Sequence, residues 1–165
     1  MRSLIVLASL LLGAQAFAAE PSGCDKFAWP LAAEQKLLAE AERAAAGADL
    51  DRDSGKAVEF DLVSLAEAGL PMAPERAPQK TPALAGYLRF GKAAGPRLYK
   101  VTLSEGAWID LVQDGHYLKP AAFTGATDCP HVRKSVKFDI GPAPFALQVS
   151  GAPATGVAVV ITPVE

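Results

Sequence analysis

The sequence predicts a mainly β protein, an antiparallel β-sandwich of about eight strands with one N-terminal flanking α-helix. Apolar and polar residues alternate through several short runs in the second half of the chain, which is typical of half-buried strands. Turns that contain Gly or Pro separate these runs, and Asp114-Gly115 is a dipeptide that tight hairpins favour. One convincing stretch has the spacing of a helix, and it precedes the strands.

The helical pattern covers about residues 30–46. Pro30 suits a first helical position because its missing N–H needs no partner there, and Gly47 is a natural stop. The apolar residues on one face form a narrow, alanine-rich stripe, so we expect the helix to lie on a sheet. These residues are Leu31, Leu37, Leu38, Ala41 and Ala45.

The first strand is expected in AVEFDLVSL, where Val58, Phe60 and Leu62 alternate with acidic residues. An extended surface crossing follows over residues 66–83, since its four prolines forbid a long helix or a central strand. The other strands are expected in YLRF, RLYKVTLSE, AWIDLVQ, HYLK, VRKSVKFDI, FALQVS and GVAVVIT.

Residues 1–18 have the layout of a secretory signal peptide, with Arg2 before a short apolar core and small residues before the expected cleavage after Ala18. Cleavage there leaves a single domain of residues 19–165, periplasmic or secreted. The alternative is a lipoprotein signal acylated at Cys24, although Pro21 stands where such a signal has a branched apolar residue.

The formal net charge of the chain is −2, and this near balance gives no argument for nucleic acid or an anionic membrane as a partner. No apolar stretch after the signal approaches the roughly 18 residues that a membrane-spanning helix needs. Cys24 and Cys129 are the two cysteines, and an even count in an exported protein predicts one disulfide. The alternatives are two reactive thiols or a metal pair, for which His131 is the nearest histidine.

The segment DLDRDSG raises the question of a calcium loop, because Asp49, Asp51 and Asp53 occupy alternate positions. A helix-loop-helix calcium site needs glycine at loop position 6 and glutamate at position 12, but Ser54 and Phe60 stand there. The favoured interpretation is a solvated turn between helix and strand; a weak ion site in another geometry is the alternative.

Asp114, His116 and His131 are the candidates for a two-histidine, one-carboxylate iron site. The hairpin turn already explains Asp114, and His131 lies beside the expected disulfide, so we predict no metal and no cofactor. The chain also lacks a G-x-S-x-G nucleophile elbow and a G-x-G-x-x-G phosphate loop. These patterns favour a protein without catalytic residues.

A surface patch is the remaining candidate site. Alternation in AWIDLVQ turns Trp108 and Asp110 outward, and alternation in VRKSVKFDI turns Arg133 away from the core. If the two strands are neighbours, these side chains form an aromatic patch between opposite charges that can stack a sugar or grip a peptide. The alternative is a rim tryptophan beside an exposed ion pair. Lys134 falls in the apolar register, so we expect it to snorkel at a sheet edge.

The second half of the chain contains a group of short motifs: Gly106-Ala107-Trp108-Ile109-Asp110, Asp114-Gly115, Cys129, Arg133-Lys134, Leu147-Gln148 and Ser150-Gly151. In these motifs, over roughly 65 residues, the chain resembles a set of small exported bacterial proteins of unknown function. Some members are labelled homogentisate 1,2-dioxygenase, which implies a non-haem iron enzyme, but members have lysine at the position of His116. The strand order is also similar to that of pre-peptidase C-terminal β-sandwich domains, and that resemblance implies an accessory, non-catalytic role.

We therefore expect an exported, non-catalytic β-sandwich that binds a small ligand, a glycan or an envelope protein. The alternative is a homogentisate-type iron dioxygenase, as the family label implies. A structural subunit of an envelope complex is a third hypothesis.

Overall fold

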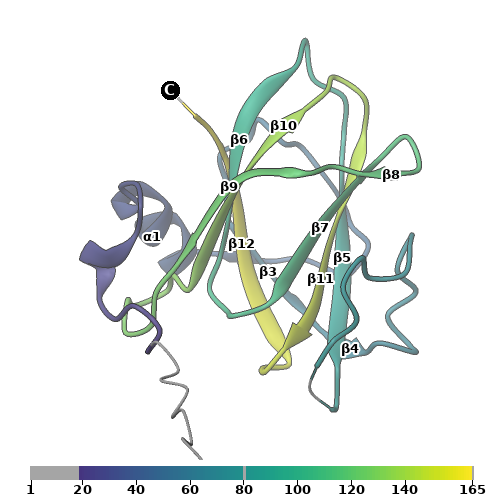
Figure 1. Cartoon of the computed structure of the whole chain (residues 1–165). Helices are drawn as coiled ribbons and strands as arrows, with labels where there is room; N and C mark the ends of the chain where they lie inside the picture. The colour runs from purple at the N-terminus through teal and green to yellow at the C-terminus, as the bar shows by residue number, and fades with distance from the viewer. Residues whose placement is uncertain (1–18, 80, 165) are drawn as a thin grey trace, which may run out of the picture.

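The computed structural model describes residues 19–79 and 81–164, so the expected signal peptide lies outside the described residues. Two β-sheets pack face to face into a sandwich, and one short helix flanks it, as the sequence predicts (Figure 1). More strands form than expected, because several have only two residues. The elements are η1 (Cys24–Lys26), α1 (Ala32–Ala39), β1 (Glu42–Arg43), β2 (Asp49–Leu50), β3 (Val58–Asp61), β4 (Val63–Ser64), β5 (Leu84–Phe90), β6 (Arg97–Leu103), β7 (Trp108–Gln113), β8 (His116–Tyr117), β9 (Pro120–Gly125), β10 (Lys134–Ile140), β11 (Phe145–Ala152) and β12 (Gly156–Pro163).

The first sheet has the strand order β1-β3-β12-β6-β10-β9, and the second has the order β2-β5-β11-β7-β8 with β4 also paired to β5. Most pairs are antiparallel, and the exceptions among the named strands are β1 with β3 and β2 with β5. Asp114 and Gly115 join β7 to β8, and both have positive φ, as this kind of hairpin requires. The sequence did not predict β9, since PAAFTG lacks alternation.

Alternate residues of the two sheets meet in the interior of the sandwich. In β11, for example, Phe145, Leu147 and Val149 point into the core, while Gln148 lies on the opposite face. The period of two that predicts the strands therefore also builds the core between them.

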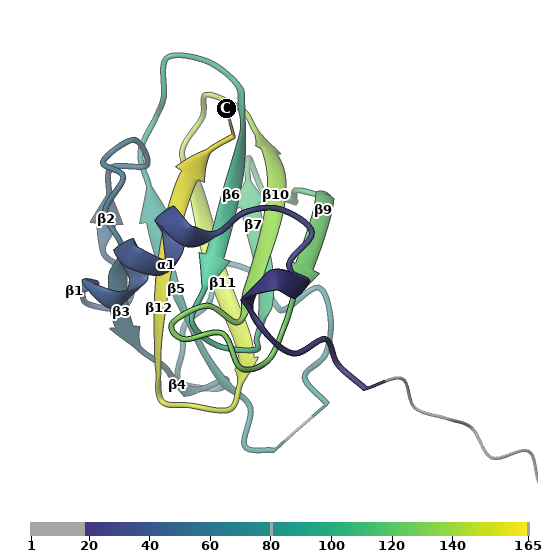
Figure 2. The same cartoon turned by 90° about the vertical axis from the view of Figure 1, so that its left-hand side faces the viewer.

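The helix is shorter than the sequence predicts, because α1 spans Ala32–Ala39 and not about 30–46. β1 follows, pairs in parallel with β3, and places Arg43 in ion pairs with Glu59 and Asp61. This pairing ends the helix although the following residues are good helix formers. Figure 2 shows α1 on the outer face of the first sheet, over β12. No helix in the described part of the chain is long and apolar enough to cross a membrane.

A buried ion pair fixes α1 on the sheet. Glu34 of α1 pairs with Lys100 of β6 and accepts a hydrogen bond from the hydroxyl of Thr162 at 2.6 Å. Burial raises the pKa of Glu34, but the hydrogen bonds from Lys100 and Thr162 outweigh it, so this pKa lies below its ordinary value. Charge pairing and the apolar packing of Leu31 and Leu38 together hold the helix.

The Pro-rich crossing, residues 66–83, runs over the outer face of the second sheet. No helix or strand forms in its described part. Side chains of the sheet hold its backbone: Met72 N–H donates to Gln148 Oε1 at 2.8 Å, and Glu75 N–H donates to Asp110 Oδ2 at 3.1 Å. The crossing therefore covers a face of β7 and β11 that the sequence alone leaves open.

The disulfide between Cys24 and Cys129 is confirmed, and it joins residues 105 positions apart. It ties the N-terminal segment to the loop that precedes β10. Ser22 and Thr127, close to the two cysteines, form an isolated parallel bridge. The N-terminal segment thus runs beside the end of β9.

The acidic segment DLDRDSG is not the simple solvated turn that the sequence favours, because Asp49 and Leu50 form β2 beside β5. Its carboxylates have separate partners: Asp49 pairs with Arg89 at 2.7 Å, and Asp53 accepts a hydrogen bond from the hydroxyl of Tyr99 at 2.8 Å. The three aspartates do not gather around a common point, since no group of three potential metal ligands occurs among the described residues.

Arg52, between these aspartates, is only 1% exposed. Its guanidinium donates to the carbonyls of Gly91, Gly141 and Ala143, with the shortest contacts at 2.7, 2.8 and 2.5 Å. It also lies 4.9 Å from the ring centroid of Phe145. One side chain therefore joins the turn after β5 to the turn after β10.

We predict that Arg52→Met lowers the free energy of unfolding by about 2–4 kcal/mol, because it removes several hydrogen bonds from a charged donor and leaves buried carbonyls without it. Urea denaturation of residues 19–165 measures the change. Arg97→Met, at an exposed position on β6, is the matched control and is expected to change stability little. Equal effects of the two substitutions would contradict the role of Arg52.

We also predict that the paired substitution Cys24→Ser with Cys129→Ser lowers the free energy of unfolding by about 4–5 kcal/mol, as chain entropy gives for a closed loop of this length. Reduction of the unmodified protein with dithiothreitol should give the same loss in urea denaturation. A stable reduced protein would show that the disulfide matters little to the fold.

Candidate functional site

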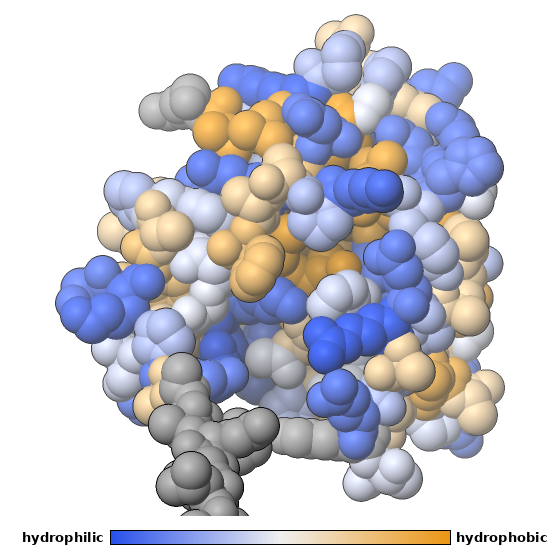
Figure 3. Space-filling model, viewed as in Figure 1, coloured by the Kyte–Doolittle hydropathy of each residue, from blue (hydrophilic) through white to orange (hydrophobic). Residues whose placement is uncertain are grey.

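A large open cleft of about 1110 Å³ lies where β7 and β10 begin. β9 forms one wall, and the end of the Pro-rich crossing forms another. Figure 3 shows a hollow in this face of the molecule, bordered by both hydrophobic and hydrophilic residues. The lining includes five large basic or aromatic side chains: Arg76, Arg133, Lys134, Trp108 and Phe123.

Trp108, at the start of β7, holds two of these cations. The guanidinium carbon of Arg76 lies 5.3 Å from the centroid of the indole ring, and Nζ of Lys134 lies 5.2 Å from it. Both distances permit cation–π attraction. The indole N–H donates to Asp110 Oδ1 at 2.7 Å, which fixes the orientation of the ring.

Lys134 does not snorkel at a sheet edge, because β10 lies inside its sheet between β6 and β9. Its ammonium donates instead to the carbonyl of Ala107 at 2.9 Å, across the gap between the sheets. Burial lowers the pKa of Lys134, and repulsion from Arg133 and Arg76 lowers it further. Three like charges therefore converge on one part of the cleft.

Asp110 faces outward from its sheet, as the alternation predicts, but it is only 4% exposed because the crossing covers it. It does not line the cleft. Burial raises the pKa of Asp110, and the hydrogen bonds from Glu75 N–H and the indole of Trp108 oppose this increase. Asp110 thus orients Trp108 through a hydrogen bond from beneath the crossing, and it is not part of an open patch.

Arg133 lines the same cleft as Trp108, so the structure brings two of the three expected patch residues together. Its guanidinium forms an ion pair with Glu20 at 2.5 Å and donates to the carbonyl of Ala126 at 3.3 Å. The charge of Arg133 is thus compensated by Glu20 of the N-terminal segment. The cations that contact the ring of Trp108 are Arg76 and Lys134 instead.

Two buried polar atoms of β11 have no hydrogen-bond partner among the described residues: Gln148 Nε2 beneath the crossing and Ser150 Oγ at the cleft. Ser150 lies opposite Trp108 in the β11–β7 ladder and lines the cleft, although it is only 2% exposed. A buried hydroxyl without a partner is destabilising, so it marks a position where a polar ligand atom or a water molecule gains a hydrogen bond.

The candidate iron ligands do not come together. Asp114 and His116 belong to the β7–β8 hairpin, whereas His131 follows Cys129 in the loop before β10. β8 and the loop before β10 lie on opposite sides of the molecule in Figure 1. Each of the two histidines is exposed.

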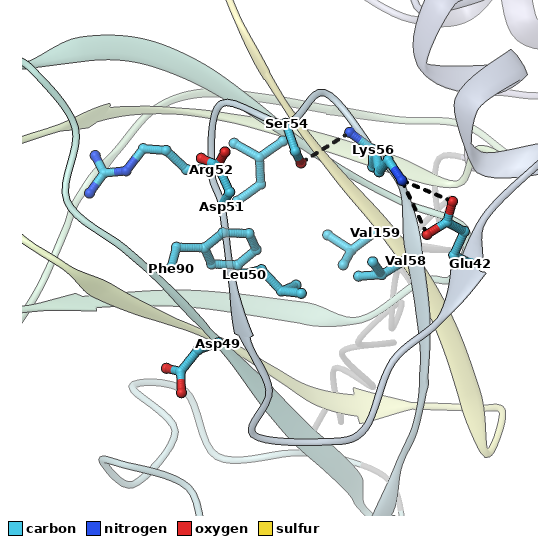
Figure 4. Close-up of a pocket in the computed structure, with 11 residues that line it drawn as sticks. Glu42, Asp49, Leu50, Asp51, Arg52, Ser54, Lys56, Val58, Phe90 and Val159 are labelled. Carbon is cyan, nitrogen blue, oxygen red and sulfur yellow. Dashed lines mark hydrogen bonds and ion pairs between the residues drawn. The ribbon is translucent and has the colours of Figure 1, made fainter.

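A second hollow of about 230 Å³ lies beside β2 and the acidic segment (Figure 4). Leu50, Val58 and Phe90 provide apolar walls, and the ion pair of Lys56 with Glu42 at 3.1 Å lies at its side. Asp49 pairs with Arg89, and Arg52 is used by backbone carbonyls, so this small hollow offers fewer free charged groups to a ligand than the larger cleft does.

Sequence reasoning missed Arg76, Phe123 and Glu20 as residues of the site. Arg76 lies in the Pro-rich crossing and Phe123 in the unexpected strand β9, so no periodic pattern placed either one. Lys134 did give a signal, because a lysine in an apolar register needs a specific partner. That partner is the carbonyl of Ala107.

No protein-family model matches the chain, and no curated protein matches it. Among solved structures, the pre-peptidase C-terminal domain of a collagenase from Bacillus anthracis is similar over 73% of this chain and 97% of that domain, with 11% sequence identity and a TM-score of 0.38. This is a weak likeness of fold, in agreement with the expected resemblance, and it carries no argument about the site.

We predict that Trp108→Phe raises the pKa of Asp110 further, because the substitution removes an indole hydrogen bond that favours the ionised carboxylate. Carbon-detected NMR titration of the side-chain carboxyl measures this shift. Asp49, whose pKa is lowered by Arg89, is the internal control and should not move. An unchanged Asp110 pKa would show that the indole bond is weak in solution.

Proposed function

We propose that this protein is an exported, non-catalytic binding module that holds an anionic ligand in the cleft beside Trp108. The single observation that carries the proposal is the convergence of Arg76, Arg133 and Lys134 on one open cleft. Like charges held together favour an anion that neutralises them.

The balance of charge along the cleft supports an anionic ligand. Glu20 and Glu105 are the acidic residues of the lining, and Glu20 is already paired with Arg133. Arg76 and Lys134 have no ion pair within the described residues. The cations without an ion pair are therefore concentrated around Trp108, where the buried carboxyl group of Asp110 offsets part of their charge.

The geometry of Trp108 favours recognition by charge over stacking of a sugar on the ring. Arg76 and Lys134 both lie within cation–π distance of the indole. A sugar face would have to displace a cation from the ring. We infer that Trp108 positions the two cations, and that they contact the ligand.

The chemistry of the lining supports a non-catalytic role. Ser104, Thr124 and Ser150 provide the hydroxyl side chains of the lining, and the described lining contains no histidine or cysteine to activate them. Ser104 accepts a hydrogen bond from Ala158 N–H at 2.9 Å, which explains its position structurally. Nothing in the placement of Asp114 or His116 favours the iron dioxygenase alternative.

NMR of isotope-labelled protein tests the proposal, because the chain has two indole N–H groups and only one belongs to the cleft. We predict that citrate, added at constant ionic strength, shifts the Trp108 indole resonance in a saturable manner. Trp29 is the internal control: its indole N–H donates to the hydroxyl of Ser135, and Nζ of Lys137 lies 4.3 Å from its ring centroid. The Trp29 indole resonance should shift little.

The neutral sugar maltotriose should leave both indole resonances unchanged, and Lys134→Met should weaken the response to citrate. Equal shifts of the two indoles, or a response to maltotriose alone, would contradict an anion-binding cleft at Trp108.

A further inference from the structure

We propose that the anionic ligand is an acidic peptide segment of a partner protein, added as an extended strand to the free edge of β9. This inference rests on the proposed function and names the class of ligand for the same cleft. Three observations carry it: an unpaired backbone edge, a peptide of this chain on the same edge, and the position of the cations.

β9 is the last strand of its sheet, and it lines the cleft. Ala126 N–H donates to the carbonyl of Arg133, and Thr124 pairs with Ser135, so these residues direct their backbone groups toward β10. Backbone groups alternate in direction along an antiparallel strand. The N–H and C=O of Phe123 therefore point away from β10, toward an edge that no described strand covers.

The N-terminal segment already uses the continuation of this edge. Thr127 N–H donates to the carbonyl of Pro21 at 2.8 Å, and Gly23 N–H donates to the carbonyl of Thr127 at 2.8 Å. These two bonds bind an extended peptide in a parallel bridge, and the adjacent Glu20 places its carboxylate on Arg133 at 2.5 Å. This rim thus accepts an extended peptide that carries a carboxylate.

The remaining cations lie on the walls of the cleft that the free edge borders. Lys134 is the register partner of Gly125 on the β10 side of β9, and Arg76 lies across the cleft beside Trp108. Carboxylates at alternate positions of a strand are separated by about 7 Å, so one peptide can present several of them to one wall.

The size and exposure of the site also favour a peptide over a small molecule. Small-molecule pockets commonly have volumes of about 300–1,000 Å³ and are more enclosed, whereas this cleft is larger and open. Phe123 is 75% exposed, more than any other large apolar residue that the structure describes, and offers an apolar contact beside the edge. Strand addition of this kind combines backbone hydrogen bonds with side-chain selection.

Fluorescence anisotropy with residues 19–165 tests the inference. The probe is a labelled, end-blocked six-residue peptide of alternating glutamate and valine, and the comparison peptide has lysine in place of glutamate. We expect saturable binding of the acidic peptide, weaker binding as sodium chloride screens the charges, and no binding of the basic peptide. Arg76→Met and Lys134→Met should each weaken binding by about tenfold, the loss typical of one charge-assisted contact.

Phe123→Pro is the most specific variant, because it removes the N–H that faces the free edge and leaves the β9–β10 hydrogen bonds intact. Phe123→Ala is its matched control, since it removes the ring but keeps the N–H. We expect Phe123→Pro to weaken binding at least as much as the charge substitutions and more than Phe123→Ala. Glu20→Gln should tighten binding several-fold, because it releases Arg133 for the added peptide.

Other outcomes overturn the inference in distinguishable ways. If oligogalacturonate binds with dependence on Lys134 and the acidic peptide does not, the anion-binding function stands and the ligand class is wrong. If sedimentation shows a dimer that Phe123→Pro dissociates, a second copy of the chain covers the edge. If citrate, oligogalacturonate and the acidic peptide all fail to bind, the proposed function fails as well.

Discussion

The hydrogen bond from Lys134 to the carbonyl of Ala107 fixes the ammonium beside Trp108, and the positive charge of the cleft depends on that position. Lys134 begins β10 in the first sheet, and Ala107 precedes β7 in the second, so one side chain joins the two sheets at the cleft. The ammonium must lose water to reach that carbonyl, and this burial lowers its pKa. The neighbouring indole of Trp108 offsets part of the loss through its electron-rich face.

The same contact brings the ammonium of Lys134 close to two other cations, and this repulsion is not required to form the fold. An aliphatic residue at position 134 would continue the apolar register of β10 without bringing a cation close to Arg76 and Arg133. The buried, unpartnered hydroxyl of Ser150 and the raised pKa of Asp110 occur in the same region. Local rules of stability are most often broken where a protein binds something, so this concentration of unfavourable groups supports the assignment of the site.

The sequence predicted those parts of the fold in which a short period governs the structure. The alternation in VRKSVKFDI and FALQVS corresponds to β10 and β11, and Asp114-Gly115 forms the expected hairpin. The predicted helix is too long because the pairing of β1 with β3 is a tertiary contact, and this contact overrides the helix propensity of the alanine-rich segment. Arg52 was missed for a similar reason, since its three carbonyl acceptors belong to turns that are distant in sequence.

The candidate site could be predicted less well, because it is made of segments without periodicity. Trp108 and Arg133 do share a cleft, but the prediction of an open patch failed for Asp110, which lies beneath the crossing. The prolines predict that residues 66–83 are extended, but they do not predict which face of the sandwich this segment covers. That placement depends on side-chain acceptors such as Gln148, which hold the backbone of the crossing through hydrogen bonds.

The disulfide makes the order of this site depend on the redox conditions around the protein. Cys24 and Cys129 bring the N-terminal segment beside Thr127, so that Glu20 reaches Arg133 and the edge after β9 is occupied. Without the bond, two backbone hydrogen bonds, the hydrogen bonds of Ser22 with Asp128 and of Thr127 with the carbonyl of Pro21, and the ion pair of Glu20 with Arg133 would have to order this segment. These contacts are mostly exposed, and an exposed ion pair contributes only about 0–1 kcal/mol, so a reduced chain holds Glu20 on Arg133 less firmly. Because such disulfides persist in oxidising compartments, the rim of the cleft is complete only where the proposed export would take the protein.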